Sequence, residues 1–315
     1  MPSLASHTRG AFKIAAPWRG STQSEWEDME DYMTVMRIGV VGAGTMGRGI
    51  AQVCAQAGYE VMLSDVNADA VAAGRADIEK QLARAVERER IDAAERDATL
   101  ARIVTASGLD AMADVDLCIE AATENPQIKL ELFRSLEAAC RDDAVLASNT
   151  SSVSLTRIAG ACRVPQRVIG MHFFNPVPVM KLVELIRALQ TSDATFQTAH
   201  AVADQVGKTA VSVADSPGFV VNRMLVPMIN EAVYVLAEGL ASAAEIDEAM
   251  KLGANHPIGP LALADLIGID VCLYVMDVLH REFADSKYRA CPLLRRMVDA
   301  GYLGRKSGRG FFEYG

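Results

Sequence analysis

Short apolar runs alternate with longer segments of helical periodicity between residues 37 and 216. This alternation is typical of strand–helix–strand units, whose strands lie parallel in one sheet. Six runs have the length and composition of strands: residues 38–41, 60–64, 116–120, 145–148, 168–173 and 209–213. The pattern therefore predicts an α/β domain with a mostly parallel sheet over residues 37–216.

The segments between these runs predict helices. After the first run, apolar side chains recur at i, i+3, i+4 and i+7 and form one helical stripe, which Gly58 ends. The stripe consists of Ile50, Val53, Cys54 and Ala57. Residues 68–106 are rich in Ala, Glu and Arg and predict one or two exposed helices that project from the first domain.

Strand-like runs cease after Ser216 and Pro217. A serine suited to a helix N-cap, followed by a proline suited to the first helical position, predicts that a helix begins there. The rest of the chain is typical of helices, so we expect a second, all-helical domain over residues 217–315.

Residues 1–36 differ from the rest of the chain. The first twenty residues carry Arg9, Lys13 and Arg19 without an acid, which is faintly similar to a mitochondrial transit peptide but lacks a sustained amphipathic period. We treat this segment as a leader outside the fold. We expect the protein to lie in the cytoplasm, with the mitochondrial matrix as the alternative.

Composition excludes several classes of protein. Half of the residues are apolar and 23% are charged, as in ordinary globular proteins. The formal net charge of −9 disfavours nucleic acid and anionic lipid as partners, and no apolar run is long enough to cross a membrane. The six cysteines stand singly, without the spacing of zinc ligands, and predict small buried side chains in a reducing compartment and no metal site.

A glycine-rich turn follows the first predicted strand. It has the pattern GxGxxG and consists of Gly42, Ala43, Gly44, Thr45, Met46 and Gly47. In this position Gly42 suits the tight turn, Gly44 admits a pyrophosphate against the backbone, and Gly47 lets helix and strand approach closely. The turn predicts a Rossmann-type dinucleotide site, although an ordinary glycine-rich loop of an α/β unit is the alternative.

Asp65 ends the second predicted strand, 18 residues after Gly47. A carboxylate at about this interval accepts the hydroxyls of an adenosine ribose and repels a 2′-phosphate. Because no Arg or Lys stands beside Asp65, the sequence favours NAD over NADP as the cofactor.

Oxidation of an alcohol needs a base, and histidine suits this task at neutral pH. Of the five histidines, His7 lies in the leader and two lie in helical runs, which leaves His172 and His256. His172 ends an apolar run and enters a loop broken by Pro176, where open α/β sheets place ligands. Glu184 lies twelve residues later, and a loop return would pair it with His172, although a chance surface Glu is the alternative.

Four runs, residues 42–47, 148–152, 172–184 and 215–223, together resemble the L-3-hydroxyacyl-CoA dehydrogenases, closest to the 3-hydroxybutyryl-CoA dehydrogenases. The likeness extends from about Arg37 to Tyr314. It implies reversible NAD-dependent oxidation of an (S)-3-hydroxyacyl-CoA to the 3-ketoacyl-CoA, in fatty-acid or butanoate metabolism. It also implies a homodimer formed through the helical domain.

The resemblance implies a role for each matching residue of the reaction site. His172 matches the catalytic base and Glu184 its carboxylate partner. Ser151 matches a serine that contacts the substrate oxygen near the nicotinamide, and Asn222 an asparagine that polarises the same oxygen. From the residues alone, each has an ordinary alternative: Ser151 could be a turn or helix cap, and Asn222 could be a buried amide that binds the backbone.

The resemblance also implies cofactor contacts beyond the turn and Asp65. They are Glu124 and Lys129 near the nicotinamide half, Asn149 and Asn175 in the same crevice, and Lys306 near the C-terminus. Two of these have ordinary alternatives, because Glu124 precedes a predicted helix start and Lys306 lies in a basic, solvated segment.

The region expected to meet CoA departs most from the family. The family's serine and lysine that contact CoA match Gln81 and Arg88 in this sequence, which puts the serine contact in doubt. Lys80, Arg84 and Arg88 recur at i, i+4 and i+8 and line one helical face, which suits an anionic thioester carrier. A solvated charged face is the alternative.

Two other functions stay open at this stage. One is a related NAD-dependent dehydrogenase of a sugar acid such as gulonate, in which we expect a different loop after the catalytic histidine. The other is a catalytically silent dinucleotide-binding protein.

Overall fold

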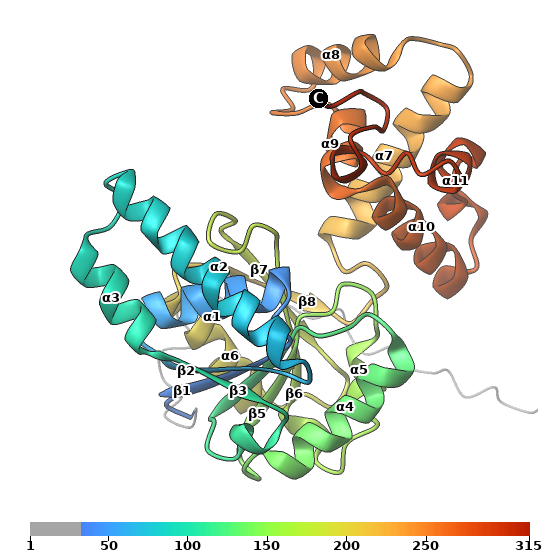
Figure 1. The fold of residues 1–315 in the computed structure, drawn as a ribbon. Helices are drawn as coiled ribbons and strands as arrows, with labels where there is room; N and C mark the ends of the chain where they lie inside the picture. Colours follow the sequence, from blue (N-terminus) through green and yellow to red (C-terminus); the bar gives the residue numbers. More distant parts are fainter. Residues whose placement is uncertain (1–32) are drawn as a thin grey trace, which may run out of the picture. The chain divides into compact units, whose positions relative to one another are not determined.

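The computed structural model describes residues 33–315; most of the expected leader lies outside the described residues. Eight strands form one sheet in the order β3-β2-β1-β4-β5-β6-β7-β8 (Figure 1). Neighbouring strands are parallel except β6 and β7, which are antiparallel. The strands are β1 (Arg37–Val41), β2 (Glu60–Asp65), β3 (Ile103–Ser107), β4 (Leu117–Glu120), β5 (Val145–Ser148), β6 (Val168–Phe173), β7 (Leu182–Arg187) and β8 (Thr209–Ala214).

All six predicted strands form, but the sheet contains two more. Strand β3 was expected to belong to the exposed helical segment 68–106, and that assignment is wrong at its end. Most of its side chains are exposed at the sheet edge, so it lacks the apolar pattern of a central strand. Strand β7, which contains Glu184, follows the expected loop return and was not predicted. By contrast, β4, β5 and β6 are buried throughout and match their continuous apolar sequence.

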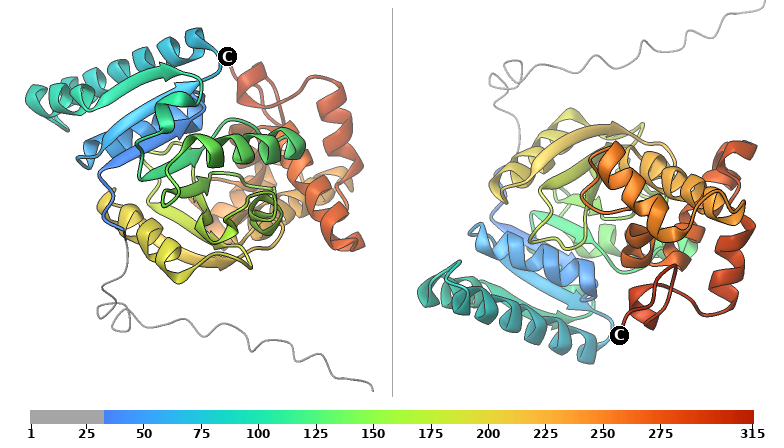
Figure 2. Two further views of the ribbon diagram at one scale, coloured as in Figure 1. Left: turned by 90° about the horizontal axis from the view of Figure 1, so that it is seen from below. Right: turned by 90° about the horizontal axis from the view of Figure 1, so that it is seen from above.

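Helices cover the sheet. They are α1 (Thr45–Gln56), α2 (Ala68–Glu87), α3 (Ala93–Ala101), α4 (Pro126–Ala139), α5 (Leu155–Ala159) and α6 (Asp193–Gln205). The predicted stripe forms the buried face of α1, and Gly58 follows with a φ of +99°. In both views of Figure 2, α2 and α3 lie toward one end of the sheet and α6 toward the other.

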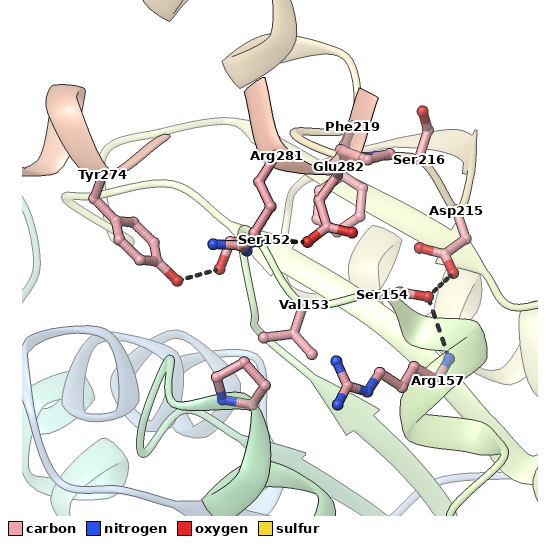
Figure 3. A pocket seen from close by; sticks show the side chains of 12 residues that line it. Ser152, Val153, Ser154, Arg157, Asp215, Ser216, Phe219, Tyr274, Arg281 and Glu282 are labelled. Carbon is pink, nitrogen blue, oxygen red and sulfur yellow. Dashed lines mark hydrogen bonds and ion pairs between the residues drawn. The ribbon is translucent and has the colours of Figure 1, made fainter. Parts of the chain in front are cut away.

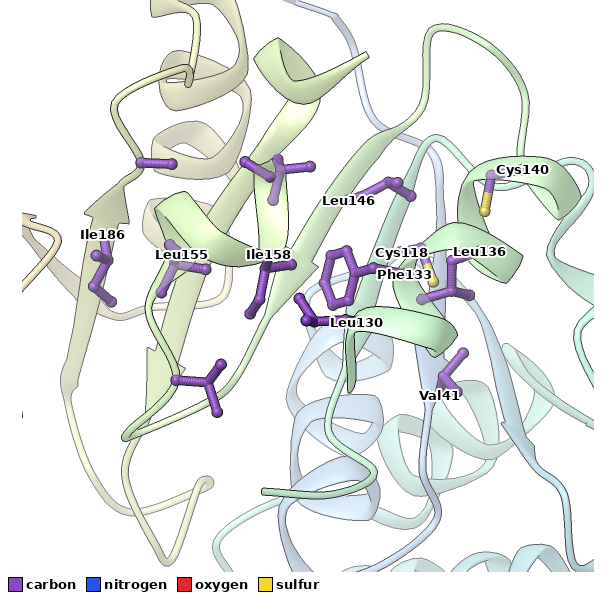
Figure 4. Packing of buried hydrophobic residues seen from close by; sticks show 14 of the residues in the cluster. Val41, Cys118, Leu130, Phe133, Leu136, Cys140, Leu146, Leu155, Ile158 and Ile186 are labelled. Atoms are coloured by element: carbon purple, nitrogen blue, oxygen red, sulfur yellow. The ribbon is translucent and has the colours of Figure 1, made fainter. Parts of the chain in front are cut away.

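A core cluster under α4 and α5 packs on the central strands. Phe133 and Leu136 of α4 and Leu155 and Ile158 of α5 are fully buried against this side of the sheet (Figure 4). Burial of each such side chain contributes about 1.5–3 kcal/mol of transfer free energy. The loops that follow β4, β5 and β6 therefore begin from a rigid platform.

Glu137 is a buried carboxylate in this platform. It accepts hydrogen bonds from the N–H groups of Arg163 and Val164, at 2.8 Å each, and lies beside Arg167. Burial raises the pKa of Glu137, but these N–H groups and the nearby guanidinium groups outweigh burial. The pKa therefore lies below its ordinary value.

The C-terminal part of the chain is helical, as predicted. It contains α7 (Val221–Ala237), α8 (Ala243–Gly253), α9 (Pro260–Ile267), α10 (Ile269–Phe283) and α11 (Pro292–Asp299). Its core includes Ile229, Met276 and Leu294. These helices and the sheet belong to one compact unit, Met33–Gly315.

The predicted helix start at Ser216 and Pro217 is wrong. Residues 217–220 form turns, with φ +72° at Gly218 and +49° at Phe219, and α7 begins at Val221. The first N–H groups of α7 are bound by a side chain of the sheet, described below, so a serine cap is not needed.

Within residues 33–315, no helix is long and apolar enough to cross a membrane. The same part of the chain has no group of three or more His, Cys, Asp or Glu side chains that would hold a metal ion. Its six cysteines are unpaired, and all but Cys162 are buried.

Candidate active site

The three glycines of the turn after β1 differ in their surroundings. Gly42 has a φ of +104°, and a Cβ there would lie 2.6 Å from the Ala121 oxygen. A Cβ on Gly47 would lie 1.7 Å from the Gly42 oxygen, so this glycine permits close packing of α1 on the turn. A Cβ on Gly44 would meet no atom within 4 Å. The fold requires the first and last glycines, whereas Gly44 leaves open space.

The N-terminus of α1 faces this space without a side-chain cap. Gly44 is the N-cap residue of α1, the first turn of this helix carries no acidic residue, and Thr45 is exposed. Unsatisfied N–H groups at a helix N-terminus carry partial positive charge and bind anions such as a pyrophosphate. The turn therefore fits the diphosphate of a dinucleotide.

Asp65 ends β2 beside the same turn. Its Oδ2 accepts a hydrogen bond from Ala43 N at 2.9 Å, and its Oδ1 accepts one from Asn67 N at 3.1 Å. The predicted ribose acid therefore lies next to the predicted pyrophosphate site. It also fixes the backbone of the turn.

His172 and Glu184 face each other across β6 and β7. The antiparallel register pairs the two residues directly, and His172 Nδ1 lies 2.8 Å from Glu184 Oε2. Both side chains are buried, with exposed fractions of 6% and 1%. The predicted pairing is present, and residues 174–181 form the predicted loop return; the antiparallel strand register, which the sequence did not reveal, places the two residues opposite each other.

The second oxygen of Glu184 binds the start of α7. Its Oε1 accepts hydrogen bonds from Val220 N at 3.1 Å and Val221 N at 3.0 Å. The positive end of the helix and these N–H groups offset the cost of burying the carboxylate. Glu184 therefore joins the sheet to the helical part of the chain.

The hydrogen-bond pattern determines the tautomer of His172. A carboxylate only accepts, so the proton of a neutral imidazole lies on Nδ1, and Nε2 keeps its lone pair. Within residues 33–315, Nε2 makes no hydrogen bond. The rings of Phe174 and Phe219 pack on the imidazole, with centroids 4.5 and 5.6 Å away.

Glu124 organises the loop between β5 and α5. Its Oε2 accepts hydrogen bonds from Thr150 Oγ1 at 2.7 Å and Ser152 Oγ at 2.8 Å, and its Oε1 accepts one from Ser151 N at 3.2 Å. Ser151, half-buried, is thus held through its backbone. Sequence reasoning named Glu124 and Ser151 separately but did not foresee their contact.

Two of the three predicted asparagines follow the carboxyl ends of β5 and β6, and the third lies at the start of α7. Asn149 is buried, and its Oδ1 accepts a hydrogen bond from Phe173 N at 2.9 Å, next to His172. Asn175 is exposed and precedes Pro176 through a cis peptide bond. Asn222 lies in the first turn of α7, directly after Val221, whose N–H donates to Glu184.

Two predicted cofactor residues have protein partners instead of open space. Lys129 is 1% exposed, and its Nζ lies 2.5 Å from Glu120 Oε2 and 3.5 Å from Ser148 Oγ. Lys306 Nζ binds the carboxylate of Asp270 at 2.6 Å, at the start of α10. Sequence reasoning missed Glu120 and Ser148, although each is a polar residue at the end of an apolar strand.

A basic cleft of about 390 Å³ lies between α1, α2 and the loop after β6. The predicted face of Lys80, Arg84 and Arg88 lines it together with Gln81. Sequence reasoning missed Arg48 and Arg90 in the same cleft, and Arg48 is held by Asp77 at 2.6 Å. Their charge was visible in the sequence, but the packing of α1 on α2 was not.

A smaller pocket of about 130 Å³ lies beside the Glu124 loop. Figure 3 shows Ser152 on one wall, hydrogen-bonded to the Tyr274 hydroxyl of α10 at 3.2 Å. On the other side of the pocket, Ser154 Oγ donates to Asp215 at 2.7 Å. The contact between Ser152 and Tyr274 joins the loop to the helical part of the chain.

Comparison with known proteins agrees with this geometry. Residues 37–216 match the NAD-binding domain of 3-hydroxyacyl-CoA dehydrogenase, and residues 218–314 match the C-terminal domain of the same family. A Bacillus subtilis protein named probable 3-hydroxybutyryl-CoA dehydrogenase is 54% identical over 282 residues, 90% of this chain and 98% of that protein. The Bradyrhizobium diazoefficiens 3-hydroxybutyryl-CoA dehydrogenase is 51% identical over 280 residues, 89% of this chain and 96% of that protein.

A solved structure has the same fold. The (S)-3-hydroxybutyryl-CoA dehydrogenase of Ralstonia eutropha superposes with a TM-score of 0.87 and 53% identity, over 90% of this chain and all of that one. The predicted fold class, a Rossmann-type domain followed by a helical domain, is therefore confirmed. This chain belongs to the 3-hydroxyacyl-CoA dehydrogenase family.

Proposed function

We propose that the protein catalyses the reversible NAD-dependent oxidation of (S)-3-hydroxyacyl-CoA to 3-ketoacyl-CoA, in fatty-acid or butanoate metabolism. 3-Hydroxybutyryl-CoA is the first candidate substrate, because the relatives above carry that name over nearly their whole length. The observation that carries the proposal is the buried His172–Glu184 pair, in which His172 Nε2 has no hydrogen-bond partner among residues 33–315.

The NAD-binding domain supplies the cofactor site in this proposal. Gly42, Gly44 and Gly47, with the N–H groups of Thr45 and Met46, hold the pyrophosphate, and Asp65 accepts the ribose hydroxyls. Glu124, Asn149 and Asn175 line the side of the nicotinamide. NAD, when bound there, supplies the acceptor for the hydride that leaves C3 of the substrate.

His172 is the catalytic base. Its Nε2 takes the proton of the substrate hydroxyl, and Glu184 stabilises the imidazolium that forms and keeps the ring in one orientation. Ser151 and Asn222 bind the substrate oxygen and stabilise the negative charge that develops on it. In the reverse direction the protonated His172 returns the proton.

The basic cleft binds the CoA part of the substrate. Lys80, Arg84 and Arg88 supply charge for its phosphates, and Arg48 adds a fourth cation on the facing helix. In this proposal the four cations bind CoA in place of the family's serine, whose matching position holds Gln81.

A substrate panel tests the proposal against its rivals. We expect NADH formation with 3-hydroxyacyl-CoA thioesters and NAD, much less with NADP, and none with gulonate or free 3-hydroxybutyrate. Turnover of gulonate alone would favour the sugar-acid dehydrogenase, and NAD binding without turnover of any substrate would favour the silent dinucleotide-binding protein.

A homodimer through domain 217–315, in the cytoplasm, completes the proposal. Met224, Leu240 and Leu252 are each at least 70% exposed in this helical part, and a subunit interface there would cover them. Light scattering after gel filtration should give twice the chain mass, and a monomer would contradict this interface. The unpaired cysteines support a reducing compartment.

A further inference from the structure

Lys208 is a buried cation outside the reaction site. It lies just before β8 with an exposed fraction of 8%. Its Nζ donates to two backbone carbonyls, those of Val177 at 2.6 Å and Met180 at 2.9 Å. Within residues 33–315 no carboxylate forms an ion pair with Lys208.

The two carbonyls belong to the loop between β6 and β7, residues 174–181. The loop turns back on itself, because the Pro176 oxygen accepts hydrogen bonds from Val179 N at 2.9 Å and Met180 N at 3.0 Å. The Val177 side chain is buried against α1, where a Cβ on Gly49 would lie 2.9 Å from Val177 Cβ. Lys208 therefore binds two residues of this turn.

This loop connects the catalytic pair with the basic cleft. At its start, Phe174 packs on His172 at 4.5 Å between ring centroids. At its tip, Pro178 and Val179 line the cleft that holds Arg48 and Arg84. A shift of the loop would change both the packing of the imidazole and the shape of the cleft.

A buried ammonium without an acid partner is costly for folding, and an apolar side chain of similar length would be cheaper. Burial accordingly lowers the pKa of Lys208. Two charge-assisted hydrogen bonds to carbonyls offset part of the cost, and they do so only while the loop keeps this conformation. The cation and the loop conformation therefore stabilise each other.

We propose that Lys208 is a positioning residue for the thioester substrate, because it holds the loop 174–181 between the catalytic pair and the basic cleft. This inference rests on the proposed function. It assigns the tip of the loop, Pro178 and Val179, to acyl-CoA binding, because the tip lines the cleft, whereas Asn175 at the start of the loop stays on the nicotinamide side.

Lys208→Met tests this role through the two Michaelis constants. We expect the KM for 3-hydroxybutyryl-CoA to rise about 10- to 100-fold, with the KM for NAD within about 2-fold of wild type. The matched control is Lys251→Met, since Lys251 lies on α8 away from the loop and is paired with Glu248. Its two KM values should equal those of the wild type.

A second measurement does not depend on turnover. Lys181 is exposed at the end of the loop, and release of the loop from Lys208 should speed trypsin cleavage after Lys181, measured by mass spectrometry on the folded proteins. If the wild type oxidises no 3-hydroxyacyl-CoA, the proposed function fails, while this cleavage still decides whether Lys208 holds the loop.

The inference is overturned if Lys208→Met leaves both the thioester KM and the cleavage rate unchanged. It is also overturned if the KM values for thioester and NAD rise equally, because that result indicates a general loss of structure. If Lys208→Met yields no folded protein, Lys208→Gln is measured in the same way and is judged by the same two outcomes.

Discussion

Glu184→Gln removes the negative charge of the His172–Glu184 pair and changes its hydrogen bonding, but keeps the shape of the side chain. The amide has the same size as the carboxylate, but one of its two heads becomes a donor. The Oε1 position accepts from Val220 N and Val221 N, so the amide oxygen must stay there. The NH₂ group is then directed at His172 Nδ1, 2.8 Å away in the native protein.

This arrangement reverses the tautomer of His172. An NH₂ group donates to Nδ1, so Nδ1 becomes the acceptor and the proton moves to Nε2, which can no longer accept the substrate proton. Flipping the amide restores the tautomer but leaves the part-buried N–H groups of Val220 and Val221 unsatisfied, at about 1–3 kcal/mol each. At 1.36 kcal/mol per tenfold change in rate, we expect kcat to fall about 10²- to 10⁴-fold.

The assay follows NADH formation from saturating 3-hydroxybutyryl-CoA. NAD affinity should stay within about 2-fold of wild type, because Glu184 does not contact the glycine turn. Glu238→Gln is the matched control, since Glu238 is exposed at the C-cap of the same helix, α7. A folded Glu184→Gln protein that retains kcat within a few-fold of wild type would refute the role of the pair.

Three further outcomes are expected. Gly44→Ala should fold with unchanged stability, because Gly44 has an ordinary φ of −68° and open space around it, but should bind NAD at least about 10-fold more weakly. Gly47→Ala should lose at least about 2 kcal/mol of unfolding free energy, measured with urea. Equal stability of the Gly44→Ala and Gly47→Ala proteins would contradict the packing described. Asp65→Ala should weaken NAD binding in calorimetry by about 10-fold or more and narrow the preference over NADP, and an unchanged preference would count against the ribose contact. The lowered pKa of Glu137 contributes stability above the ordinary Glu pKa, and this stability is lost as pH falls through the pKa of the folded state. The difference in unfolding free energy between wild type and Glu137→Gln should therefore be largest near neutral pH and vanish in acid. A difference that does not change with pH would exclude Glu137 as the source of this pH-dependent stability.

Local patterns sufficed for much of the fold. The central strands were predictable because parallel strands are buried on both faces and read as continuous apolar runs. Strand β3 was not, because an exposed edge strand has little apolar sequence and follows a long helical segment. The start of α7 was misplaced because its N–H groups are bound by Glu184, which is distant in sequence.

The site was predictable where its parts are local. The glycine turn and Asp65 follow from sequence order, and His172 from its place at a strand end. The contact of Glu124 with Ser151 and the burial of Lys129 depend on how separate strands and helices meet, so spacing does not reveal them. The cleft partner Arg48 was missed for the same reason, because it faces α2 from α1.

The antiparallel step between β6 and β7 has a consequence for how this enzyme can diverge. Since the ladder of the sheet aligns imidazole and acid, the intervening hairpin can gain or lose residues without separating them, provided that the strands keep their alignment. A slip of one residue, by contrast, would turn the acid to the opposite side of the sheet. If the proposed function holds, substrate preference can change at the hairpin while His172 and Glu184 stay paired.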